Sequence, residues 1–191
     1  MKKADVIQLR AETVSVESLS DDALIAACGT GDRAARALLF ERFLGVVHRF
    51  VARMRGSDPD AIEDLVQASF ISAFQSAPRY RGGNAKGWLL GIAANHTRTY
   101  ARGEIRRKRA LGVVADEAPR TVEPGNLALL SKLPQAIASL PHDLRAVVVL
   151  VDLEGERGAD AAAALGIPQG TMWRRLYNAR QALRAALEGS P

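Results

Sequence analysis

The chain has 191 residues, enough for one large domain or two small ones. Apolar residues make up 48% and charged residues 25%, which argues against disorder, and the low aromatic content of 5% favours helices over sheets. The net charge of +5 points weakly to a polyanionic partner, and the single cysteine, Cys28, excludes an internal disulfide.

The first helical signals follow a segment without periodicity. Residues 1–18 show no sustained apolar pattern and are predicted to form a flexible tail. Ser20, with the two acids after it, offers N-cap oxygens for a short helix, and Asp32 does so for a longer one. Apolar residues then recur at spacings of three and four up to Gly56, which predicts one buried face: Leu38, Leu39, Phe43, Val46, Val47, Phe50, Val51 and Met54.

Two more helices complete a predicted first domain over residues 19–110. One follows the caps Ser57 and Asp58 and stops at Pro78 and the Gly82-Gly83 pair. Its inward face is predicted to hold Ile62, Leu65, Val66, Phe70, Ile71 and Phe74. The next helix turns Trp88, Leu89, Ile92 and Ala93 inward and then becomes basic.

Residues 111–130 contain prolines, glycines and acids and are predicted to be a flexible linker. Helical periodicity returns over residues 131–188, the second predicted domain. Within it, Ala162, Gly166 and Ile167 are spaced as in a helix-turn-helix, with Met172, Leu176 and Leu183 facing inward. The predicted fold class is therefore all-α, with two small helical domains joined by a flexible linker.

Two basic patterns indicate nucleic acid. The last helix presents Arg and Asn side chains, with no acid between Asp160 and Glu188, and these side chains suit guanine and adenine edges. The segment from Arg79 to Arg109 contains nine Lys or Arg residues and only one acidic residue, Glu104. Aromatic residues lie among them, and this combination suits unpaired nucleotides. The alternatives are a helical hairpin with a solvated basic face and, for the second pattern, a core Trp88 beside solvated arginines.

Together these segments resemble the sigma-70 superfamily, in its minimal extracytoplasmic-function (ECF) group with only the second and fourth conserved regions. AIEDLVQASFISAFQSAPRYRGG, followed by GWLLGIAANHTRTYARGEIRRKR, resembles region two. LPHDLRAVVVLVDLEGERGADAAAALGIPQGTMWRRLYNARQALRAAL resembles region four. The similarity covers about residues 20–188, apart from the linker.

The resemblance implies a protein that binds core RNA polymerase and promoter DNA and directs transcription initiation, restrained by an anti-sigma factor. Polymerase contact is implied for Glu63, Asp64 and Gln67. Binding of the minus-10 element is implied for Arg79, Tyr80, Arg81, Asn84, Lys86, Asn95, Arg98, Arg102 and Arg106. Reading of the minus-35 element in the major groove is implied for Thr171, Trp173, Arg174, Arg175, Asn178 and Arg180.

The chain departs from the family pattern at several positions. Ala68 replaces an acid in the DLVQ motif, which predicts altered docking on polymerase. In the first helix of the helix-turn-helix, Gly158 and Ala161 stand where the family usually has an aromatic residue and an isoleucine. Loss of a buried Ile side chain costs about 2–5 kcal/mol, so the second domain is predicted to be marginal alone or supported by its neighbours.

A catalytic function has little support in the sequence. His48, His96 and His142 are scattered, and no phosphate-cradling glycine loop or zinc spacing occurs. We therefore predict no enzymatic activity, metal, cofactor or small-molecule substrate. The N-terminus lacks the apolar run of a signal peptide and no stretch could span a membrane, so a cytoplasmic protein is expected. The alternatives are a helix-turn-helix regulator that binds a palindrome unaided and a sigma-like adaptor that does not melt promoters.

Overall fold

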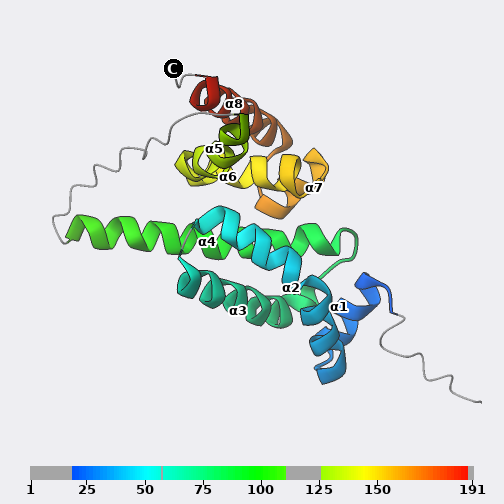
Figure 1. Cartoon of the computed structure of the whole chain (residues 1–191). Helices are drawn as coiled ribbons and strands as arrows, with labels where there is room; N and C mark the ends of the chain where they lie inside the picture. The colour runs from blue at the N-terminus through cyan, green and yellow to red at the C-terminus, as the bar shows by residue number, and fades with distance from the viewer. Residues whose placement is uncertain (1–18, 57, 111–125, 189–191) are drawn as a thin grey trace, which may run out of the picture.

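The computed structural model describes residues 19–56, 58–110 and 126–188, with side chains omitted for 126–131, and the described chain is built from helices (Figure 1). The first unit consists of α1 (Asp21–Gly29), α2 (Arg33–Arg55), α3 (Pro59–Ser76), the 3-10 turn η2 (Ala77–Arg79) and α4 (Ala85–Ala110). The second unit consists of α5 (Asn126–Ser139), α6 (His142–Val148), the π-helical turn η3 (Val149–Leu153), α7 (Gly158–Leu165) and α8 (Gln169–Glu188). The predicted all-α fold is confirmed.

The second unit begins earlier than the sequence indicated. Helix α5 starts at Asn126, so residues 126–130 of the predicted linker are helical. The last helix-breaking residue of the segment is Gly125, and leucines and an alanine follow soon after it. Helix α5 can therefore begin directly after Gly125. The predicted tail, residues 1–18, and residues 111–125 of the linker lie outside the described residues.

Side-chain caps start three helices of the first unit, as predicted. Asp32 accepts hydrogen bonds from the backbone N–H groups of Ala34 at 2.8 Å and Ala35 at 3.1 Å. Ser20 and Asp58 cap α1 and α3 in the same way. Each cap satisfies N–H groups that have no partner within the helix, so the sequence defines these helix starts locally.

The apolar stripe of α2 is the centre of the first unit's core. Phe50 and Leu39 are fully buried, and α2 packs against α1, α3 and α4. The prediction for α3 is wrong at Ile71, which is 49% exposed. Its neighbour Phe70 instead fills the space beside α2, with its ring centroid 4.7 Å from that of Phe40, and one residue farther along a helix points about 100° away.

The helix-turn-helix has the predicted geometry. Gly166 ends α7 in the left-handed conformation at φ 62°, which glycine adopts without a steric penalty. Its N–H bonds back to carbonyls of α7, and the N–H of Ile167 donates to the Ala162 carbonyl at 3.0 Å. Met172 and Leu176 of α8 are buried and hold the two helices together.

The two units pack against each other. Figure 1 shows α5–α8 stacked on the side of the first unit formed by α2 and α4, with α7 directly beside α4. Buried residues of both units form one continuous apolar cluster. The alanine-rich α7 is thus supported by a neighbour, one of the two alternatives that the sequence left open.

Candidate nucleic-acid interface

Helix α4 combines a buried half with a basic, exposed half. Leu89, Leu90 and Ala93 pack into the core, whereas the exposed residues of the basic half include Arg102, Arg106, Arg107 and Arg109. Together with Thr99 and Ile105, the arginines line a shallow groove of about 460 Å³. Arg102 and Arg106 form no ion pair with any described residue, so their charges are available to an anion.

Arg98 differs from the other arginines of the predicted stripe. It is half-buried, and its Nε lies 3.7 Å from Oδ1 of Asp143 on α6. Asp143 also forms an ion pair with Arg175 of α8, in which Oδ2 of the acid lies 2.7 Å from Nη2 of the arginine. One acid therefore joins a residue predicted to bind the minus-10 element with one predicted to bind the minus-35 element.

The loop before α4 is fixed by an aromatic pair and by Asp22 of α1. The rings of Tyr80 and Trp88 lie 4.9 Å apart, and the Tyr80 hydroxyl donates to Asp22 at 2.7 Å. Burial and this hydrogen bond raise the pKa of Tyr80 far above its usual value. The Gly83 N–H donates to the same carboxylate at 3.3 Å. Arg79 and Arg81 remain exposed on the loop.

The second unit closes over this loop and forms a cleft of about 770 Å³. Arg79, Asn95 and Trp88 line it from the first unit. His142 and Arg175 line it from the second. The predicted minus-10 residues thus lie partly at the boundary between the units rather than on an open surface.

Two glutamates of the second unit engage residues assigned to the minus-10 element. Asn84 donates from its side-chain amide to Glu156, and Lys86 pairs with the same carboxylate at 3.1 Å. Lys86 also donates to the backbone carbonyl of Glu154, whose carboxylate pairs with Arg53 of α2. Apolar periodicity and the basic patterns gave no signal for these two glutamates or for Arg53.

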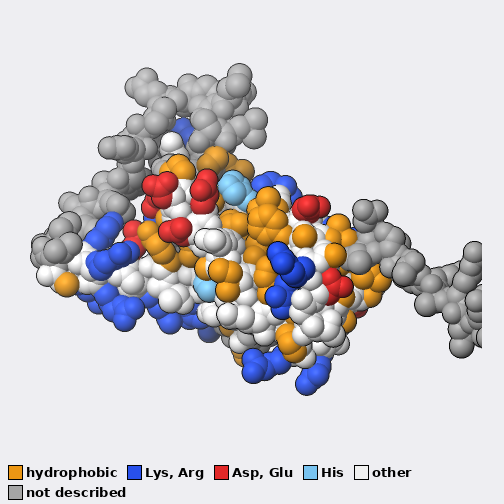
Figure 2. Space-filling model, turned by 90° about the horizontal axis from the view of Figure 1, so that it is seen from below, with side chains coloured by type: hydrophobic (Ala, Val, Ile, Leu, Met, Phe, Trp, Pro, Cys, Tyr) orange, Lys and Arg blue, Asp and Glu red, His pale blue; other side chains and the backbone are white. Residues whose placement is uncertain are grey.

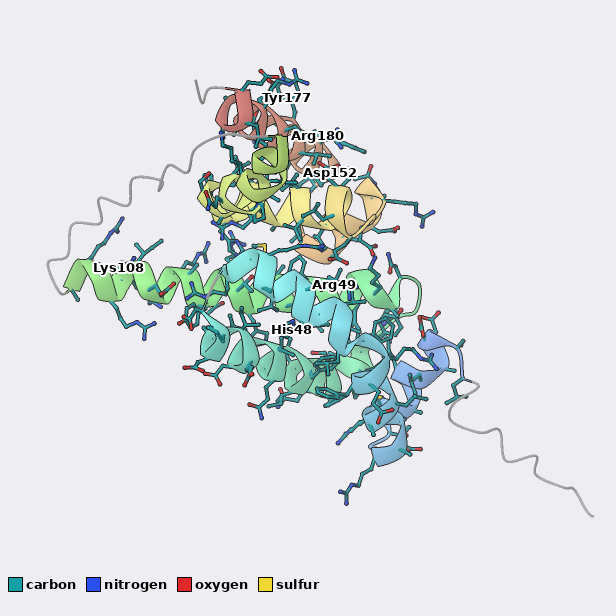
Figure 3. All side chains as sticks on the ribbon, in the orientation of Figure 1. His48, Arg49, Lys108, Asp152, Tyr177 and Arg180 are labelled. Atoms are coloured by element: carbon teal, nitrogen blue, oxygen red, sulfur yellow. The ribbon has the colours of Figure 1, made fainter. Side chains whose placement is uncertain are left out.

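The exposed face of α8 carries the predicted major-groove residues. Trp173 is 52% exposed, and Arg174 and Asn178 lie on the same outward side. Figure 3 shows Tyr177 on the outer side of α8, and it shows Arg180 close to Asp152. The guanidinium of Arg180 binds that carboxylate at 2.6 and 3.1 Å, which raises the pKa of Arg180.

Gly158 explains one departure from the family pattern. A Cβ atom on Gly158 would lie 2.5 Å from the ring of Trp173 and 2.7 Å from the Met172 methyl group, closer than atoms can approach. The absence of a side chain at 158 therefore allows Trp173 to lie against the start of α7. Thr171, at the first turn of α8, is half-buried.

Helix α3 presents a surface of the opposite charge. Asp60, Glu63 and Asp64 are exposed in its first half, and the helix contains no Lys or Arg. Gln67 and Ile71 continue the same exposed stripe, each one turn farther along. Figure 2, seen from the α3 side, shows a group of acidic side chains together on one part of this face, with Lys and Arg on other parts of it.

The histidines do not form a catalytic group within the described residues. His96 bonds to Ser72 at 2.8 Å and His142 to Thr97 at 3.0 Å, whereas His48 is exposed on α2 (Figure 3). Cys28 is buried, and burial raises the pKa of its thiol. The described parts of the chain hold no cluster of His, Cys, Asp and Glu that could bind a metal. None of the described helices has the length and apolarity of a membrane span.

Comparison with known proteins identifies both units. The family description "Sigma-70 region 2" matches residues 39–107, and "Sigma-70, region 4" matches residues 130–183. The "ECF RNA polymerase sigma-E factor" of Haemophilus influenzae is 32% identical over 190 residues, covering 90% of this chain and 97% of that protein. The chain belongs to the ECF group of the sigma-70 family. The factor of the same description from Escherichia coli K12 is 33% identical, covering 87% of this chain and 94% of that protein.

Solved structures support this assignment of the sigma fold. The sigma factor RpoE of Bartonella quintana, crystallised with the anti-sigma factor NepR, matches with a TM-score of 0.64 and 26% identity, covering 80% of this chain and 96% of that one. CnrH, solved with the cytosolic domain of CnrY, matches with a TM-score of 0.63 and 24% identity, covering 90% and 99% of the two chains, and this likeness concerns the fold. Sigma factors initiate transcription and are not enzymes, so family membership confirms the prediction of a non-enzymatic protein.

Proposed function

We propose that this sigma factor brings core RNA polymerase to its promoters, with region 2 holding the minus-10 element and region 4 reading the minus-35 element. The observation that carries this assignment is the presence of both matched regions in one chain with three exposed surfaces of different chemistry. These surfaces are the acidic stripe of α3, the basic half of α4 and the outward face of α8.

The stripe on α3 is the proposed contact with core polymerase. Exposure of Glu63, Asp64 and Gln67 on one side of a rigid helix supports this role. Ala68, where the family usually carries an acid, is half-buried beside the stripe, so its substitution leaves the exposed acids in place. We expect docking to depend mainly on Glu63, Asp64 and Gln67.

The minus-10 element would bind along α4 and the loop before it. Arg102 and Arg106 are suited to backbone phosphates, and Tyr80 with Trp88 offers aromatic surface beside the exposed Arg79 and Arg81. The exposed Asn95 offers an amide to base edges or phosphates. A flipped base held at this loop would offset the few kcal/mol that unstacking costs. Asn84, Lys86 and Arg98 would join this surface when regions 2 and 4 separate.

The minus-35 element would bind α8 in the major groove. Arg174 suits guanine, Asn178 suits adenine, and the exposed Trp173 can contact a thymine methyl group. Thr171, Arg175 and Arg180 flank these residues and suit base or phosphate contacts. The helix-turn-helix presents α8 in the way that such motifs use to enter the groove.

Regulation by an anti-sigma factor is part of the proposal. Both solved relatives are complexes, one with the anti-sigma factor NepR and the other with the cytosolic domain of CnrY. We expect a protein of the same kind to hold this chain inactive in the cytoplasm, where its polymerase acts.

Run-off transcription tests the proposed function. Purified bacterial core polymerase would be combined with the full-length protein and a promoter from its own operon. The expected result is a specific transcript that depends on the protein. The double variant Arg102→Ala/Arg106→Ala should lose it, because two phosphate contacts disappear.

Arg33→Ala/Arg49→Ala is the matched control, since it removes the same charge from exposed positions of α2. This variant should keep the transcript. Tight binding of duplex DNA by the protein alone, without transcript or association with core polymerase, would overturn the proposal and favour a regulator or adaptor.

A further inference from the structure

Helix α1 lies along the segment that leads into α4. At the end of α1, a Cβ atom on Gly29 would lie 3.1 Å from the backbone nitrogen of Pro78 in η2, so the two backbones approach closely. At the start of α1, Asp22 contacts the loop of residues 80–84. Between these two contacts α1 is anchored in the core by three fully buried side chains, those of Leu24, Ile25 and Cys28. Helix α1 is therefore a firm support for the loop.

Both oxygens of the Asp22 carboxylate bind this loop. Oδ1 accepts a hydrogen bond from the Tyr80 hydroxyl at 2.7 Å, and Oδ2 accepts one from the Gly83 N–H at 3.3 Å. The helix itself does not require this carboxylate, because Ser20 caps α1 through the N–H of Ala23. The side chain of Asp22 thus serves the loop rather than its own helix.

The loop needs such a support because two of its residues are consecutive glycines. Gly82 and Gly83 have φ angles of 83° and 105°, and glycine loses more conformational freedom on ordering than any other residue. A Cβ atom on Gly82 would lie 3.6 Å from Oδ2 of Asp22, so the carboxylate lies beside both glycines. On the other side, the ring of Tyr80 packs against that of Trp88, with centroids 4.9 Å apart. The loop is therefore held in one shape between α1 and α4.

The proposed function assigns a flipped base of the minus-10 element to this loop. Binding is tighter when the receiving loop is already ordered, because less conformational entropy is then lost on binding. Arg79 and Arg81 are the neighbours of Tyr80 in the chain and are exposed, so a shift of the tyrosine would move both cations as well. The shape of the loop therefore affects both the base and the phosphates beside it.

We propose that Asp22 of α1 is a positioning residue for minus-10 recognition, which holds Tyr80 and Gly83 so that the loop is shaped for the base before DNA binds. Asp22 acts through these two residues and does not itself contact DNA. The inference rests on the proposed capture of a base at this loop. It extends the determinants of minus-10 binding to a helix outside residues 39–107, the part matched to region 2.

Asp22→Ala tests this role, and Asp21→Ala is the matched control. Both remove one acid from the first turn of α1, but the carboxylate of Asp21 binds Arg42 of α2 at 2.7 Å. Tyr80→Phe removes only the hydroxyl donor and keeps the ring beside Trp88. Holoenzyme would be formed from core polymerase and each full-length protein, and unchanged capture of polymerase would show that the variants are folded.

The probe is the fluorescent non-template strand of the minus-10 element, intact or with one base removed at each position in turn. In wild-type holoenzyme, loss of the captured base should weaken binding by about tenfold. Asp22→Ala should bind the intact strand about fivefold more weakly, and removal of the same base should then cost about twofold or less. A purely structural defect would weaken both strands alike. Asp21→Ala should match wild type with both strands.

Tyr80→Phe should lie between wild type and Asp22→Ala, and the double variant should bind no more weakly than Asp22→Ala, because the hydroxyl acts through that carboxylate. A weaker double variant would mean that the hydroxyl acts on DNA directly and would contradict the inference. So would an Asp22→Ala holoenzyme that keeps the full wild-type difference between the two strands. That result, together with a wild-type transcript in the run-off assay, rejects the positioning role alone. A wild-type holoenzyme for which no base removal matters rejects the proposed base capture, and the inference with it.

Discussion

His142 lies at the start of α6, where region 4 meets region 2. Its Nε2 is 3.0 Å from the hydroxyl of Thr97 on α4, and its Nδ1 faces Asp143 at 3.8 Å. The pKa of His142 is lowered to about 4, chiefly by burial; Arg145 and Arg98 also lower it, and Asp143 opposes them. The folded structure therefore contains the neutral imidazole.

This lowered pKa predicts a loss of stability in acid. At His142 the unfolded chain binds a proton near the ordinary pKa of 6.5, whereas the folded chain does so only near pH 4. The contribution of His142 is therefore complete above pH 6.5 and declines as the pH falls toward 4. Asparagine cannot become charged. The thermal midpoint of His142→Asn should therefore fall less than that of the wild type between pH 6.5 and 4. Parallel midpoint profiles for the two proteins across this window would contradict the assignment.

Ile71 is an exposed apolar residue within the polar stripe of α3. Its substitution should therefore affect binding to polymerase but not the stability of the fold. Ile71→Ser should change the free energy of unfolding by no more than about 0.5 kcal/mol, because the side chain contributes little to the core. Affinity for core polymerase should fall by about three- to tenfold through lost apolar contact. Urea denaturation and capture of polymerase by the immobilised protein measure the two effects.

The comparison variant for Ile71 is Ile62→Ser on the same helix. Ile62 is buried at 8% exposure, so the new hydroxyl would enter the core and unfolding should become easier by about 2–5 kcal/mol. Unchanged polymerase capture by Ile71→Ser would show that the contact ends at Gln67.

At the scale of the helices, Arg145 stabilises two helix ends at once. Its guanidinium donates to the carbonyls of Ala138 and Leu140 at the end of α5 and, at 2.6 Å, to that of Met54 in the last turn of α2. The last carbonyls of a helix lack partners within it and carry partial negative charge. Burial lowers the pKa of Arg145, with Arg55 adding to the effect. The hydrogen bonds to these carbonyls therefore offset the cost of removing the charged Arg145 guanidinium from water.

Arg145→Met should lower the free energy of unfolding by about 2–4 kcal/mol, because the carbonyls lose their donors while the side chain's length is kept. Arg184→Met is the control, since Arg184 is 67% exposed and lies 3.8 Å from Glu188 in a surface pair. Its loss should cost about 0.5 kcal/mol or less. Equal urea midpoints for the two variants would exclude the capping role of Arg145.

Helix boundaries were predictable where a single residue defines them. The caps Ser20, Asp32 and Asp58 and the terminating Gly166 act through hydrogen bonds within a few residues, so the sequence contains the whole signal. The orientation of Ile71 was not predictable from periodicity, because it lies at the edge of the apolar stripe and a packed neighbour decides which side turns inward.

At the scale of the whole molecule, the sequence predicted two helical units but not their mutual packing. Apolar periodicity marks which face of a helix is buried without naming the partner. A usable signal was nevertheless present in Gly87 and Gly91, which lie inside a helix where glycine costs about 1 kcal/mol and usually has a packing reason. A Cβ atom on Gly91 would lie 2.3 Å from the carbonyl oxygen of Ala164 on α7, whereas one on Gly103 would have no atom within 4 Å. The partner glutamates are about 65 residues away in sequence, beyond any local pattern.

This packing predicts that region 4 depends on region 2 for stability. Helix α7 contributes only Gly158, Ala161 and Ala162 to the buried interior, so the core of region 4 is small and part of its surface is covered by α4. The full chain should therefore unfold in one cooperative thermal transition. Residues 126–191 alone should melt at least about 5 °C lower, since a loss of about 1 kcal/mol shifts a small domain by that amount.

Circular dichroism of the full chain, the 126–191 fragment and Gly91→Ala measures this dependence. If the α4–α7 contact couples the regions, Gly91→Ala should split the transition and bring its first step near the midpoint of the fragment, whereas Gly103→Ala should keep a single step. A fragment that melts at the temperature of the full chain would mean that region 4 is stable by itself. The small side chains of α7 would then be explained by close approach to α4 alone.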